Sequence, residues 1–111
     1  MEKRRELIKG NIDSLLLLVI GQKPMYGYQI IKELEEKTQG YFKFKEGTLY
    51  PALHRLEKSG LLKARWEDSP GNRQRRYYHI TEKGHAVLEE RRSQWLDFLT
   101  AMNCILQPTT A

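Results

Sequence analysis

The chain has 111 residues, of which 40% are hydrophobic, and a formal net charge of +5. This length fits one domain with a small core, and the apolar run Leu15–Ile20 is far shorter than the roughly 20 residues that cross a bilayer. The single cysteine, Cys104, excludes an internal disulfide framework and fits a reducing compartment, so we expect a cytoplasmic protein.

The positive charge is concentrated in the middle of the chain. Residues 41–80 contain nine Lys and Arg against four Asp and Glu, whereas residues 1–40 contain seven against six and residues 81–111 contain three against four. A local basic surface attracts polyanions such as nucleic acid, although an ordinary solvated surface has the same composition. The fold of residues 41–80 therefore decides which of these two interpretations of the basic segment applies.

The first part of the chain predicts two helices joined by a turn. One helix spans about Leu7 to Ile20, and its second half is apolar on all sides, so we expect it to be buried on all sides. A glycine and a proline mark the turn over residues 21–24. The second helix spans about Tyr26 to Lys37 and directs three apolar residues toward the core, Ile30, Ile31 and Leu34.

A third helix follows a short extended segment. Residues 41–45 alternate between apolar and basic side chains, which predicts an extended segment with its lysines outward. The next helix, over residues 46–58, has a narrow apolar stripe for the core, Leu49, Leu53 and Leu56. Gly60 suits the left-handed position that ends a helix.

The outward face of this third helix suits the major groove of DNA. Its first turns carry the compact residues Gly47, Thr48 and Pro51, so a groove could receive the helix closely. Lys45 stands at the helix start, where a cation opposes the helix dipole and where a bound phosphate would remove that cost. An ordinary solvated helix face is the alternative interpretation.

Polar side chains on this face and just before it are the candidate DNA contacts. They are Lys43, Lys45, Thr48, Tyr50, His54, Arg55 and Lys58. Hydroxyls and lysines suit phosphates, which position a protein on DNA. His54 and Arg55 lie deeper along the helix and suit base edges, which carry the sequence information.

A β-hairpin is predicted next, with strands over residues 62–67 and 73–80 around a turn that is dense in Pro, Gly and Asn. Its return strand carries Arg73, Arg75 and Arg76, which suit a wing that lies along phosphates or in the minor groove. Three helices, a hairpin and a last helix make a mostly helical α+β fold, the winged helix-turn-helix. Residues 1–80 would form its DNA-binding domain. Residues 81–111 would form a C-terminal dimerisation helix, packed with the first helix in one structural unit.

The last helix opens at Thr81, a suitable N-cap, and runs to about Leu106. Its apolar residues follow a heptad seam, namely Leu88, Trp95, Leu99, Met102 and Leu106. Arg92 is the only charged residue in this seam. A second row widens this face, and one small domain cannot easily bury both rows. We therefore expect a homodimer, whose symmetry also suits a pseudo-palindromic DNA site.

Three segments at characteristic spacing resemble the PadR family of bacterial transcriptional regulators: YGYQI, GTLYPALHRLEKSGLL and RRYYHITEKG. The resemblance covers roughly residues 12–106, and the single C-terminal helix resembles the small subgroup of that family. It implies a homodimeric winged-helix repressor whose last helix packs with the first helix of the partner. Several relatives release DNA on binding phenolic or multidrug-like aromatic compounds. One departure is Lys45-Glu46, where the family often has Ser or Asn with Pro or an acidic residue.

The resemblance adds a second interpretation of Trp95, which could otherwise be a dimer-core residue. In some small family members a tryptophan at the matching place stacks on a flat aromatic ligand between the subunits. Leu88 and Leu99 would then line the rest of an effector site. Arg92 could favour an anionic or electron-rich ligand, or it could point outward.

An enzyme is not expected. The histidines His54, His79 and His85 are scattered, and we find no nucleophile–base pair, no phosphate-binding glycine loop and no Cys/His cluster. Glu82, His85 and Glu89 share a helix face that could hold a metal, but exposed helix decoration explains them better, so we predict no cofactor and no metal. The alternative function is a winged-helix dimer that acts as a ligand-independent nucleoid binder or a protein-interaction adapter.

Overall fold

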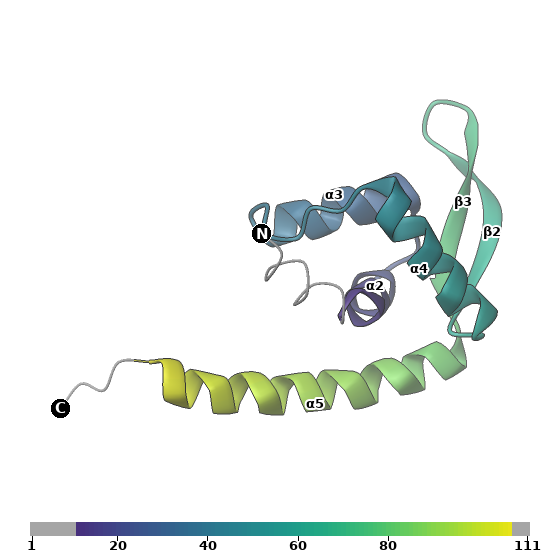
Figure 1. The fold of residues 1–111 in the computed structure, drawn as a ribbon. Coiled ribbons are helices and arrows are strands. Elements are labelled where there is room, and N and C mark those ends of the chain that lie inside the picture. The colour runs from purple at the N-terminus through teal and green to yellow at the C-terminus, as the bar shows by residue number, and fades with distance from the viewer. Residues whose placement is uncertain (1–10, 108–111) are drawn as a thin grey trace.

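The computed structural model describes residues 11–107 (Figure 1). Its elements are α2 (Ile12–Ile20), β1 (Met25–Tyr26), α3 (Gly27–Lys37), α4 (Glu46–Lys58), β2 (Leu62–Ser69), β3 (Arg73–Ile80) and α5 (Glu82–Leu106). The order of elements confirms the predicted α+β winged helix. The start predicted for the first helix, at Leu7, lies outside the described residues. Within residues 11–107 every helix is too short or too polar to span a membrane.

The strands form one antiparallel sheet in the order β1–β3–β2. β2 and β3 pair along the full length of each strand, and Gly71 and Asn72 close the turn at positive φ, 86° and 56°. β1 was not predicted, because a strand of two residues is too short to show an alternating pattern. It pairs with Tyr77 and Tyr78 of β3 and so joins the hairpin to the start of α3.

The core lies between α2, α3, α4 and the sheet. The predicted stripe of α4 forms its middle, with Leu49 and Leu53 fully buried and Leu56 2% exposed. α2 contacts α3, α4, α5 and β3. Even so, Leu15 and Leu18 are only half-buried, so the prediction that this helix is buried on all sides is wrong for these two residues.

α4 ends at Lys58, and Gly60 takes the predicted left-handed position just beyond it, with a φ of 79°. The N–H of Leu61 donates to the carbonyl of Leu56 at 2.9 Å, and the N–H of Gly60 donates to the carbonyl of Glu57 at 3.0 Å. Together these two bonds make the Schellman motif, which satisfies the last carbonyls of the helix. The chain turns directly into β2, so the hairpin starts beside the end of α4.

α5 begins at the predicted cap, where the N–H of Gly84 donates to the Thr81 hydroxyl at 3.0 Å. Its first turns dock on the core: Leu88 is 2% exposed, and a side chain on Gly84 would meet the carbonyl carbon of Leu61 at 3.1 Å. Beyond these turns the helix leaves the core and extends past the other elements (Figure 1). Its 25 residues span about 37 Å.

Candidate nucleic-acid interface

The predicted DNA-binding face of α4 is open to solvent. Every polar residue predicted on this face is exposed, and so are Lys43 and Lys45 before the helix. A Cβ added to Gly47 would meet no atom within 4 Å, so the space in front of the first turn is clear. Lys45 is the N-cap, as predicted, and its side chain makes no capping hydrogen bond. The start of α4 can therefore be approached closely by another molecule.

Tyr50 differs from the other residues of this face because its hydroxyl turns back toward α3. There it lies against the backbone of Gly27. Burial raises the pKa of the Tyr50 phenol, and the Glu46 carboxylate raises it further. The phenol is therefore protonated at neutral pH. Tyr50 links α4 to α3 in addition to its predicted place on the DNA-binding surface.

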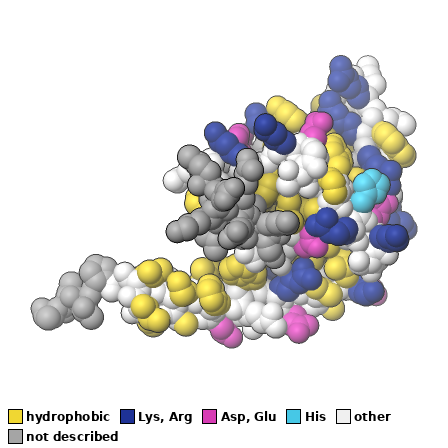
Figure 2. Space-filling view, in the orientation of Figure 1, with side chains coloured by type: hydrophobic (Ala, Val, Ile, Leu, Met, Phe, Trp, Pro, Cys, Tyr) yellow, Lys and Arg dark blue, Asp and Glu magenta, His cyan; other side chains and the backbone are white. Residues whose placement is uncertain are grey.

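A hollow of about 550 Å³ opens between the second half of α4 and β3, lined by His54, Arg55, Glu57, Lys58 and Arg76. We call this feature the α4–β3 hollow. It brings together four of the predicted DNA-binding residues, three from α4 and one from the hairpin. Figure 2 shows that Lys and Arg side chains gather over the half of the molecule that holds α4 and the hairpin.

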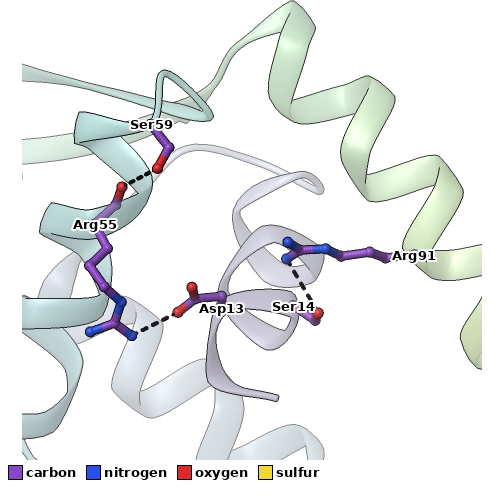
Figure 3. Close-up of polar contacts among 5 residues, drawn as sticks. All are labelled: Asp13, Ser14, Arg55, Ser59 and Arg91. Carbon is purple, nitrogen blue, oxygen red and sulfur yellow. Dashed lines mark hydrogen bonds and ion pairs between the residues drawn. The ribbon is translucent and has the colours of Figure 1, made fainter. Parts of the chain in front are cut away.

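Two carboxylates hold arginines of the α4–β3 hollow, and the sequence analysis missed both. Glu57 accepts a bond of 2.7 Å from Arg76, and Asp13 of α2 accepts one of 3.0 Å from Arg55 (Figure 3). The partners lie 19 and 42 residues apart in the chain, respectively. Nothing in the sequence pattern links an acid in the first helix to an arginine in the third.

The three arginines of β3 do not lie on one face of the hairpin. Successive residues of a strand face opposite sides of the sheet, and Arg76 faces α4 whereas Arg73 and Arg75 face away from it. The Arg75 guanidinium lies 4.5 Å from the centre of the Tyr26 ring and donates to the Tyr26 hydroxyl at 2.9 Å. It also donates to the buried Ser69 hydroxyl at 3.1 Å. Arg75 thus links β3 to β1 and to the end of β2.

The hairpin presents further residues that the sequence analysis did not select. Trp66 is 67% exposed and pairs in register with Arg76, so it shares the sheet face that borders the α4–β3 hollow. On the other face, His79 contacts the Glu67 carboxylate. Trp66 is therefore a further candidate for contact with DNA, and only its exposure in the folded protein identifies it.

The three predicted effector residues do not lie together on one open surface. Trp95 is half-buried and packs edge-to-face on Phe98, with ring centres 6.0 Å apart. Leu99 is 48% exposed, but Leu88 lies in the core near Gly21. Leu88 is therefore a core residue that is not available to line a ligand site in this conformation.

The described residues offer no metal site. Across residues 11–107, no three His, Cys, Asp or Glu side chains come close enough to hold an ion. Glu82, His85 and Glu89 are all exposed on α5, and Cys104 is an exposed thiol near its end.

Comparison with known proteins identifies the family. The model of the transcriptional regulator PadR-like family matches residues 16–90. A protein of Lysinibacillus sphaericus is 38% identical over 85% of this chain and 86% of its own, and the transcriptional regulator Rv3488 of Mycobacterium tuberculosis is 36% identical over 79% and 78%. The crystal structure of a PadR-like transcriptional regulator from Bacillus cereus matches 94% of this chain and 99% of its own with a TM-score of 0.84 and 34% identity. The chain therefore belongs to the PadR-like family of transcriptional regulators, which are not enzymes.

Proposed function

We propose that the protein is a homodimeric repressor that binds a pseudo-palindromic site on duplex DNA in the cytoplasm and leaves it when a small aromatic effector binds. The α4–β3 hollow is the observation that carries the DNA-binding step. It brings together cations of α4, which we call the groove helix because it would enter the major groove, and of the hairpin, which would form the wing. Its lining carries Arg55, Lys58 and Arg76 against one carboxylate, Glu57, so the hollow remains positive and attracts an anionic partner. A DNA backbone beside the major groove supplies that charge.

The two parts of the surface would have different tasks. His54 and Arg55, on the exposed face of α4, are suited to base edges in the major groove. Lys43, Lys45 and Lys58 are exposed around them and are suited to the phosphates on either side. Phosphate contacts would set the position of the helix, and base contacts would select the sequence.

The exposed apolar face of α5 supports a dimer. Beyond the core, Phe98 is 55% exposed, Leu99 48%, Ile105 80% and Leu106 68%. Figure 2 shows hydrophobic side chains along this outer part of the helix. A soluble monomer rarely exposes so continuous an apolar surface, and a second copy of the chain would cover it.

Contacts of α2 support a link between an effector at Trp95 and the groove helix. Asp13 of α2 holds Arg55, while the adjacent Ser14 accepts a bond of 3.4 Å from Arg91 of α5, one turn before Trp95 (Figure 3). An effector releases DNA only if it favours one arrangement of the two groove helices over another. A shift of α5 would be passed to α4 through α2.

Binding of the purified protein to the promoter region beside its own gene tests this proposal. Fluorescence anisotropy should detect tight binding to that duplex, weaker binding to a scrambled duplex, and a steep fall of log affinity with log salt. Equal affinity for both duplexes would instead favour a nucleoid binder. Absence of binding at low salt would favour a protein-interaction adapter and contradict the proposed repressor.

A further inference from the structure

We propose that Glu57 and Asp13 determine DNA specificity, because each carboxylate holds one arginine of the α4–β3 hollow and reduces its attraction for the phosphates of random DNA. This inference rests on the proposed DNA-binding function. It assigns a role to two acids at the centre of a basic surface, where they reduce the net charge instead of adding to it.

Glu57 lies within the hollow itself. Its carboxylate is 2.7 Å from the Arg76 guanidinium, and the side chains of Glu57 and Arg76 are 26% and 41% exposed. Because the pair is partly shielded from water, salt screens it less than a pair on the open surface. Any phosphate that approaches Arg76 must therefore compete with a carboxylate that is already in place.

The Glu57–Arg76 pair is held by one oxygen and one nitrogen only. Glu57 Oε1 and Arg76 Nε are both buried, and neither finds a hydrogen-bond partner within residues 11–107. A bidentate pair would engage both of these atoms and would be harder to open. The geometry fits a contact that restrains Arg76 in the free protein but that a DNA phosphate can still replace.

Asp13 pairs with Arg55 from a different element, and this second pair is more open to water than the first, with side chains 36% and 57% exposed. Asp13 belongs to α2, whose burial in the core fixes where the carboxylate sits, and its oxygen lies 3.0 Å from Arg55 Nη2 (Figure 3). Arg55 is one of the two predicted readers of base edges, with His54. Two arginines of one hollow are thus each paired with an acid, although the acids come from separate helices.

The pairs discriminate because phosphates and base edges make different demands on an arginine. Binding to random DNA depends almost wholly on phosphate charge, which a nearby carboxylate opposes. A base edge presents neutral acceptors, and the five N–H donors of a guanidinium allow it to bond a base while it keeps its carboxylate. The acids therefore weaken random binding more than binding at the correct site, and specificity is that difference.

The first test compares Glu57→Gln with Glu46→Gln, since both remove one negative charge from α4. Glu46 forms no ion pair with any of residues 11–107 and serves as the matched control. Glu57→Gln should strengthen binding to a random duplex by up to about eightfold at about 0.1 M salt and steepen the salt slope by about 0.9, the effect of one additional phosphate contact. Affinity for the promoter duplex should change less, so the specificity ratio should fall.

The Arg76→Gln background separates release of an arginine from a general change of charge. There, Glu57→Gln should gain no more than Glu46→Gln gains, because no arginine remains to be released. A gain from Glu57→Gln that persists without Arg76 would overturn the proposal. So would an unchanged affinity of Glu57→Gln for random DNA.

Asp13→Asn provides an independent arm if Glu57→Gln fails to fold. The Asp13 side chain is 36% exposed, so the amide can bond to water and the fold should persist. It should raise random-DNA affinity more in the wild-type background than in Arg55→Gln, where only the general change of charge remains. The opposite pattern would contradict the role of Asp13. If the wild-type protein bound no duplex even at low salt, the proposed DNA-binding function itself would fail, which is a different result.

Discussion

The Tyr50 hydroxyl on α4 fills the space in which a side chain on Gly27, the first residue of α3, would begin. A Cβ built on Gly27 would lie 2.8 Å from Tyr50 Cζ, closer than atoms in contact can approach. The two residues come from separate motifs, YGYQI and GTLYP, and the contact explains them together. It packs the start of α4 closely against the start of α3.

Replacing Gly27 with alanine should therefore disturb the packing of α4. The methyl group must displace the Tyr50 ring, and a forced rearrangement of this kind costs about 1–3 kcal/mol of unfolding free energy. Urea denaturation followed by circular dichroism measures the loss. Gly47→Ala is the control, since its methyl group meets nothing within 4 Å and alanine favours a helix. Equal stability of the two variants would contradict the steric role of Gly27.

Base readers and phosphate anchors should respond differently to truncation. Arg55→Ala or His54→Ala should relax the sequence preference, because a good base contact is worth about 1–3 kcal/mol. Arg73→Ala should weaken binding to specific and random duplexes about equally, since Arg73 is exposed on the wing. Competition binding with both duplexes distinguishes the two effects. The reverse result would mean that the wing selects the sequence and α4 anchors the protein.

A charge on the apolar face of α5 should prevent dimerisation. Leu99→Asp places a carboxylate where the partner helix is expected, with no donor to pair it and no water to solvate it. Sedimentation equilibrium should then show a monomer. Ser93→Asp adds the same charge to the opposite face of the helix and should leave the dimer intact. If Leu99→Asp also stays dimeric, the interface lies elsewhere.

Trp95 should report the binding of a planar aromatic effector. Stacking on an indole face contributes roughly 0.5–1.5 kcal/mol beyond area burial, and it quenches or shifts the fluorescence. Trp66 is 67% exposed and would obscure this signal, so the titration uses a Trp66→Phe background. Phenolic acids and planar aromatic cations are added while fluorescence and DNA release are followed together. Quenching that leaves DNA affinity unchanged would make Trp95 a packing residue only.

The sequence by itself determined the helices and the hairpin, their order and the winged-helix class, but not the two-residue strand β1. These properties depend on local signals: the stripe of Leu49, Leu53 and Leu56, the glycine that ends α4, and the Thr81 cap. Such signals act over a few residues, so they survive without knowledge of the packing. The alternation of a strand would also have separated Arg76 from Arg73 and Arg75, had it been applied to them.

Only the tertiary structure decided which charges are neighbours. Asp13 reaches Arg55 across 42 residues, and this contact depends on the angle at which α2 packs against α4. The same holds for Leu88, which the helical pattern assigns to a seam but which the docking of the first turns of α5 puts into the core. Side-chain partners from distant elements are set by how whole helices and strands pack, and no periodicity within one element records that.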